Sequence, residues 1–114
     1  MNLLSITYKD NEGEHLVECE DALISLTEDM IARHVVLKRA VASSQDLGFK
    51  GLYSKLKKSD MPFTFTYMFN DSITIVDTAI DNLNNVFYGL SNTEDSKVLI
   101  EQLEIHMPFP VIEV

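Results

Sequence analysis

Residues 59–90 read SDMPFTFTYMFNDSITIVDTAIDNLNNVFYGL, and two different periodicities meet in this stretch. From Ile73 onward the apolar residues recur at alternating steps of three and four, as on one face of an amphipathic helix. They are Ile73, Val76, Ile80, Leu83, Phe87 and Leu90. The opposite face of such a helix would be polar and would carry Asp71, Asp77 and Asp81. The pattern therefore predicts a helix with one buried face and one acidic face.

The residues just before this helix follow another period. Phenylalanine and tyrosine alternate with threonine and methionine from 63 to 69, a period of two in residues with high β propensity. This alternation predicts a strand, with residues 70–72 as the turn that follows it. The alternative is a helix capped by Ser59, with Pro62 in its first turn, which would extend the Ile73 pattern backwards.

The N-terminal half combines a hairpin with a long apolar repeat. Residues 3–19 contain two short apolar runs around the turn-forming residues 10–13, and they predict a β-hairpin. Between 21 and 44 the apolar residues recur at steps of three and four, which predicts a long helix. The residues in this pattern are Leu23, Leu26, Met30, His34, Leu37 and Val41. A short basic helix is expected over 49–58.

The C-terminal part predicts one more helix and an extended tail. A capping residue at Ser91 or Thr93 precedes acidic residues and an apolar face that ends before Pro108. Two prolines interrupt the apolar tail 107–114, so it is expected to be an edge strand or an extended segment.

Together these elements predict a single α+β domain spanning residues 1–114. Its small antiparallel sheet would consist of the N-terminal hairpin and the strand near 63–69, packed by three or four helices. The alternative is a mainly α domain with an N-terminal hairpin. A chain of 114 residues can bury a sufficient core without disulfides or a structural metal.

The charge of the chain limits its partners. It has 18 acidic and 9 basic residues, a net charge of −9, and this argues against direct binding to nucleic acid or to an anionic membrane. The bases are concentrated between residues 31 and 58, so the chain is acidic, then basic, then acidic.

The single cysteine, Cys19, excludes an intrachain disulfide and suits a reducing compartment. The N-terminus lacks the pattern of a signal peptide, and no apolar run reaches the ~20 residues that span a bilayer. A cytoplasmic protein is therefore expected.

The candidates for catalysis or metal binding fail on spacing or environment. His15 and Cys19 would lie ~13 Å apart along a strand, too far for one metal ion. Glu18 and Glu20 flank Cys19 and would raise the pKa of its thiol. His34 lies on an apolar stripe and is expected in the core. The sequence thus predicts no enzyme activity, no cofactor and no metal site.

Two charged clusters remain as alternatives. Asp71, Asp77 and Asp81 could share a divalent cation, but an acidic surface for a basic partner needs no further ligands. The lysines of 49–58 could bind phosphate, although a solvated helix face fits the net charge better. These lysines are Lys50, Lys55, Lys57 and Lys58.

The leading hypothesis is a small acidic protein that inhibits or neutralises a basic, nucleic-acid-binding target protein. Toxin-immunity proteins and phage anti-defence proteins, including anti-CRISPR proteins, act in this way. The expected partner-binding residues are Asp71, Asp77 and Asp81, with a second acidic edge at Glu12, Glu14 and Glu18. The alternative is a structural or assembly subunit that self-associates, for example as a homodimer, through 63–69 or the apolar tail.

Overall fold

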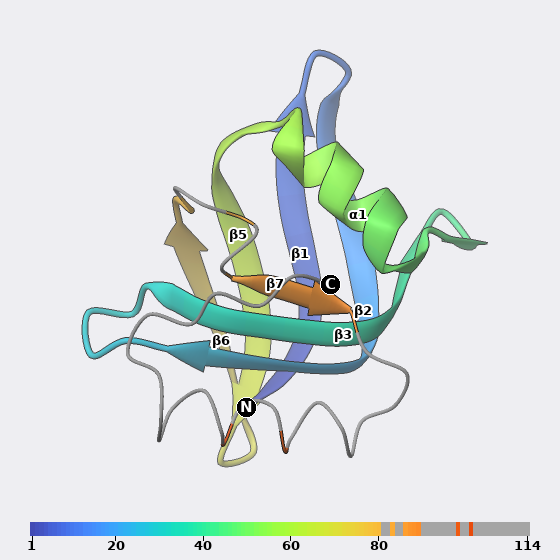
Figure 1. The fold of residues 1–114 in the computed structure, drawn as a ribbon. Helices are drawn as coiled ribbons and strands as arrows, with labels where there is room; N and C mark the ends of the chain where they lie inside the picture. Colours follow the sequence, from blue (N-terminus) through green and yellow to red (C-terminus); the bar gives the residue numbers. More distant parts are fainter. Residues whose placement is uncertain (81–82, 84–85, 90–97, 99–100, 102–114) are drawn as a thin grey trace.

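The protein is mainly β. The computed structural model describes residues 1–80, 83, 86–89, 98 and 101. Its elements are β1 (Asn2–Asp10), β2 (Gly13–Leu26), β3 (Ala32–Ala42), β4 (Gln45–Asp46), α1 (Gly48–Lys57), β5 (Asp60–Phe69), β6 (Ser72–Thr78) and β7 (Phe87–Gly89). The first six strands form an antiparallel sheet in the order β4-β3-β2-β1-β5-β6, and β7 pairs in parallel with β3. Figure 1 shows α1 lying across one face of this sheet.

The predicted α+β class with three or four helices is therefore wrong, as is its mainly α alternative. The described residues form one bounded helix, α1, beside a six-stranded antiparallel sheet. The final helix and the tail 107–114 were expected in a region that lies almost entirely outside the described residues. The fold differs from the expectation because two segments with helical spacing are strands.

The first of these segments is 21–44, which forms the end of β2, a turn and β3. Ala22 to Ser25 are all buried, so this part of β2 is covered on both faces. A run that is apolar on both faces fits a helical repeat as well as a strand. The turn is closed by Thr27, whose backbone N–H donates to the Ile31 carbonyl at 2.9 Å. The β-branched residues of β3, among them Val35 and Val36, favour the extended form.

The second segment is 73–90, whose first part is β6 rather than a helix. Ile73 and Ile75 are 64% and 65% exposed, whereas Val76 is half-buried and Thr78 is buried. This alternation has the period of a strand, and most residues of β6 are β-branched. The buried residues of the predicted helix beyond β6, Ile80, Leu83 and Phe87, still belong to the core.

The hairpin predicted over 3–19 is confirmed as β1–β2, and a second hairpin, β5–β6, stands where a strand, a turn and a helix were expected; both have two-residue turns. Asp10 pairs with Gly13 at the end of β1–β2, and Phe69 pairs with Ser72 at the end of β5–β6. In the second turn Asn70 and Asp71 have φ angles of 50° and 63°. Positive φ at both central residues is the signature of a type I′ turn, whose twist suits a hairpin. The strand predicted over 63–69 is part of β5.

The core lies between α1, β7 and the inner face of the sheet. The helix buries Leu52 and Leu56. From β5 the side chains of Phe63 and Phe65 are fully buried, and the ring of Phe65 lies 6.3 Å from that of Phe87. The short basic helix predicted over 49–58 is confirmed as α1, and it covers the sheet with its apolar side.

Candidate binding site

The outer face of the sheet, on the side away from α1, gathers several of the predicted residues. We use this name for the outward side chains of β2 up to Glu20 and of β1, β5 and β6. One cross-strand row runs through Glu18, Ser5, Thr66 and Ile75. The next row runs through Leu16, Thr7, Thr64 and Asp77. The face is thus a band of small hydroxyl side chains with acidic and apolar residues at both sides.

Strand alternation places the acids of β2 on this face. Glu14, Leu16 and Glu18 are exposed, whereas the intervening Val17 is fully buried. Lys9 pairs with Glu14 on one side and with Asp60 on the other, so its charge is opposed by two acids. Glu18 has no basic neighbour in its own row. The outer face therefore carries a net negative charge.

Asp77 is held at the far side of the same face. The hydroxyl of Thr64 donates to its carboxylate at 2.6 Å, directly across the β5–β6 pair. Three strand spacings separate β2 from β6, or ~14 Å. Glu18 and Asp77 are thus two anionic points on one face, set apart by the width of β1 and β5.

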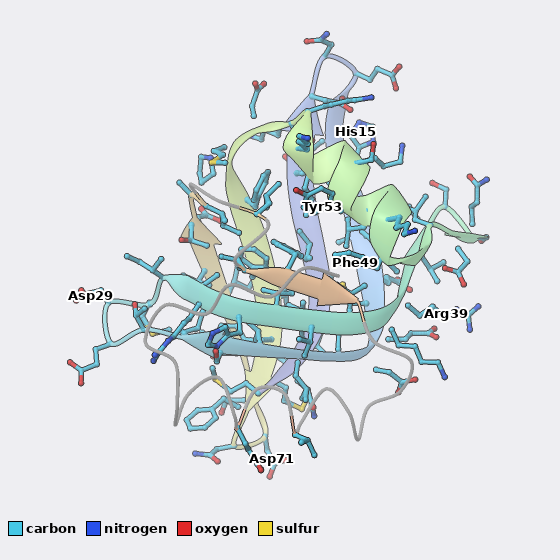
Figure 2. All side chains as sticks on the ribbon, viewed as in Figure 1. His15, Asp29, Arg39, Phe49, Tyr53 and Asp71 are labelled. Atoms are coloured by element: carbon cyan, nitrogen blue, oxygen red, sulfur yellow. The ribbon has the colours of Figure 1, made fainter. Side chains whose placement is uncertain are left out.

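The other predicted acids lie elsewhere. Glu12 is in the β1–β2 turn, where its backbone N–H donates to the Asp10 carboxylate at 2.8 Å. Asp71 is in the β5–β6 turn at the opposite end of the sheet (Figure 2). Asp81 lies outside the described residues. The predicted row of Asp71, Asp77 and Asp81 on one helix is wrong at its first two members, because Asp71 and Asp77 belong to a hairpin.

A groove beside β2 was not foreseen from the sequence. β2 has β1 on one edge and β3 on the other, but β3 pairs with it only from Glu18 onward. The β3-facing edge of Gly13–Val17 therefore has no strand partner among the described residues. A cavity of about 640 Å³ lies along this edge. Its wall includes the β3–β4 turn at Ser43–Gln45, and Lys55 of α1. Only the relative lengths of β2 and β3 could have revealed this open edge.

The inner side of the groove is built around a histidine. The ring of His15 stacks on Tyr8 with their centroids 5.0 Å apart, and its Nε2 lies 2.8 Å from Oδ1 of Asp10. The hydrogen bonds from His15 and then from the Glu12 backbone hold the pKa of Asp10 below its ordinary value. Burial, and then the charges of Asp10 and Glu12, raise the pKa of Tyr8. These contacts join β1 to β2 in the hairpin beside the groove, and Figure 2 shows His15 at this end of the sheet.

The soft ligands do not converge. No group of three metal-ligating side chains occurs among residues 1–80, 83, 86, 87, 98 and 101. Cys19 is buried, and burial raises the pKa of its thiol to about 12, which leaves it protonated and unreactive at neutral pH. His34 is fully buried, with Nδ1 3.0 Å from the Ser25 hydroxyl. The third histidine, His106, lies outside the described residues.

Four of the basic residues gather at α1, away from the outer face. Lys50, Lys55, Lys57 and Lys58 are exposed on or just after α1, which packs on the inner side of the sheet. Phe49 and Tyr53 lie among them with ring centroids 5.9 Å apart. The molecule therefore carries a basic helix on the inner side of the sheet and a net acidic outer face, and Lys55 of this helix borders the groove beside Glu14 and Glu18.

No protein-family model, curated protein or solved structure matches this chain. Within the described part of the chain, no helix has the length and apolar character that crossing a membrane requires.

Proposed function

We propose that this is a binding protein whose acidic outer face engages a basic surface of a target protein and neutralises it. The observation that carries the proposal is the placement of Glu14, Glu18 and Asp77 on one face of the sheet, opposite the basic helix. A target that normally binds nucleic acid would present such a basic surface. Immunity proteins and phage anti-defence proteins are the corresponding classes.

The physical basis is competition with phosphate. Target lysines and arginines that contact the outer face are no longer available to neutralise a nucleic-acid backbone. The complementary potentials also accelerate the encounter of the two proteins and disfavour acidic partners. The band of Ser5, Thr7, Thr64 and Thr66 supplies hydroxyl groups that can donate or accept hydrogen bonds between the acids.

The first experiment is affinity capture from the native host lysate, washed in parallel at ~50 mM and ~500 mM salt, because this range strongly changes charge screening. We expect one stoichiometric basic protein that is lost at high salt. Recovery of the chain without a basic partner at either salt concentration would contradict the proposal.

The captured partner is then tested against charge-reversal variants. Glu18→Lys and Asp77→Lys, alone and combined, should weaken binding at low salt much more than at high salt. The matched control is Asp29→Lys, which makes the same charge change at an exposed residue in the β2–β3 turn (Figure 2). Equal weakening by all of these variants would indicate an effect of net charge and would remove the outer face from the interface.

A second candidate function is self-association, and β6 favours it. Among the described strands β6 is the last of the sheet, and Ile73 and Ile75 on it are more than half exposed. An exposed apolar edge strand can pair with the same strand of a second copy. The aromatic side chains Phe63, Phe65 and Tyr67 of β5 are buried and do not supply this surface. Sedimentation analysis of the wild type and of Ile75→Lys tests this candidate: a wild-type oligomer that the variant dissociates would support it.

A further inference from the structure

The free edge of β2 suggests how a basic partner is held. Gly13–Val17 pair with β1 on one side and with no described strand on the other. In an antiparallel sheet the backbone groups of alternate residues point to opposite edges of the strand. This part of β2 therefore offers unused N–H and C=O groups to an added strand, as edge strands do in peptide-binding domains.

The space beside this edge suits such a strand. The cavity of about 640 Å³ borders β2 from Glu14 to Glu18 and is closed on its far side by the β3–β4 turn and by Lys55. Its volume is within the range typical of ligand-binding sites. An added strand would continue the line of β3, which stops pairing with β2 at Glu18.

The charge pattern along the edge specifies the occupant. On the outer face Leu16 lies between Glu14 and Glu18, and its side chain is 56% exposed. A lysine or arginine opposite Leu16 can lay its aliphatic stem on this leucine and direct its charge between the two carboxylates. A second basic residue, two positions along, would lie directly opposite Glu14.

β3 already shows this kind of pairing one step further along β2. Arg39 is the cross-strand partner of Glu20, with its Nη1 3.2 Å from Oε2 of that glutamate. Within the sheet itself, the charge of an outward acid of β2 is thus neutralised by a basic residue on the neighbouring strand.

We propose that an extended segment of a basic partner protein adds to β2 along Gly13–Val17, with Lys or Arg residues opposite Leu16 and Glu14. The recognised pattern is basic, any residue, basic, in an extended backbone. This inference rests on the proposed function, because it names how the basic partner is bound.

The test begins with a displayed library of random nine-residue peptides selected on the intact chain. We expect enrichment of sequences with Lys or Arg at two positions separated by one residue. A selection that yields no enriched peptide, or peptides without this basic pair, would overturn the proposal. Selection on the Glu14→Lys/Glu18→Lys variant should instead enrich Asp or Glu at the two positions.

The backbone contribution is tested with the best peptide and two versions of it, each N-methylated at one of the two alternate sets of amides, with affinities measured by calorimetry. Strand addition predicts that one of the two versions binds about tenfold or more weakly, since each lost hydrogen bond costs about a factor of five and more than one is lost. An equal affinity of all three peptides would overturn strand addition.

Matched variants separate this inference from the proposed function. Glu14→Gln and Glu18→Gln should lower the affinity for the peptide, whereas Asp77→Asn, three strands away, should leave this affinity unchanged. If a basic target protein binds through Glu18 and Asp77 but its affinity does not depend on a strand-forming segment, the proposed function stands and the inference falls. If the peptide pattern is found but no basic protein is captured, the strand-addition site stands and the proposed function falls.

Discussion

The two halves of β2 have opposite roles although they belong to one strand. Within the described part of the chain, Gly13–Val17 pair on one edge only and alternate between exposed and covered positions, whereas Ala22–Ser25 are buried on both faces and pair with β3. Asp21, with a φ of 52°, lies between the two halves. The comparison teaches that a strand segment becomes part of the core when both of its faces are covered, whereas an edge without a described strand partner leaves the segment available for a partner.

The largest expected effect contrasts one aliphatic residue from each half. Ile24 is fully buried, so Ile24→Ala should lower the free energy of unfolding by about 3 kcal/mol through lost burial and a residual cavity. Leu16 is 56% exposed, and Leu16→Ala should cost less than about 0.5 kcal/mol. Urea denaturation of both variants measures the difference. Similar costs would show that the two halves are not energetically distinct.

The next effect concerns pH and the buried His34 in the core half. Burial, and then the charge of Arg33, lower the pKa of His34 to about 4, so the folded protein keeps this ring neutral. The unfolded chain, with a pKa near ~6.5, takes up a proton as the pH falls. The stability that depends on a neutral His34 is therefore fully present above pH ~6.5. As the pH falls from there towards ~4, the free energy of unfolding decreases by about 1.4 kcal/mol per pH unit. His34→Gln should flatten this dependence in denaturation curves recorded across the window; an unchanged slope would assign it to other groups.

A smaller effect is expected at the junction of the halves. Asp21→Val should cost about 1 to 2 kcal/mol, because a β-branched residue at positive φ clashes with its own backbone. Asp21→Gly should be nearly neutral, since glycine adopts this φ freely. Thermal unfolding of the two variants gives the comparison. A valine variant as stable as the glycine variant would show that the junction can relax to an ordinary strand.

The smallest effect is expected at the surface ion pairs of Arg39. Its guanidinium contacts Glu20 at 3.2 Å and Asp46 at 3.3 Å, and all three side chains are about half exposed. Arg39→Ala should cost about 0.5 kcal/mol at ~50 mM salt and less at ~500 mM salt. A cost that does not change with salt would mean that the arginine stem, rather than its charge, stabilises the sheet.

Much of the strand content could be predicted, but the fold class could not. Strict alternation identified the 63–69 strand, and turn chemistry identified the β1–β2 hairpin and the turn after residue 69, but the segment after that turn was expected to be a helix and is β6. The error at 21–44 arose because Ala22–Ser25 are buried on both faces, which removes the period of two. At 73–90 the spacing of three and four placed Ile73 inside, although it is 64% exposed. There the β-branched composition was the better guide.

The sequence named Glu14, Glu18 and Asp77 among the partner-binding residues, and that role stays a prediction. Glu14 and Glu18 are exposed on one face of β2, in the hairpin that the sequence predicted. That Asp77 joins these two glutamates depends on the order β2-β1-β5-β6, which brings distant segments together. Local sequence patterns carry no information on that order. The open edge of β2 depends in the same way on where β3 stops pairing.

The pairing of β1 with β5 has a further consequence for the order in which the chain folds. The β1–β2, β2–β3 and β5–β6 hairpins each join neighbouring segments, but Ile6 pairs with Phe65, across the entire β2–α1 region. The hairpins can therefore form early, while closing the β1–β5 seam requires a large loop to be ordered first. During synthesis on the ribosome, one edge of β1 in the N-terminal hairpins therefore lacks its strand partner until β5 has been synthesised.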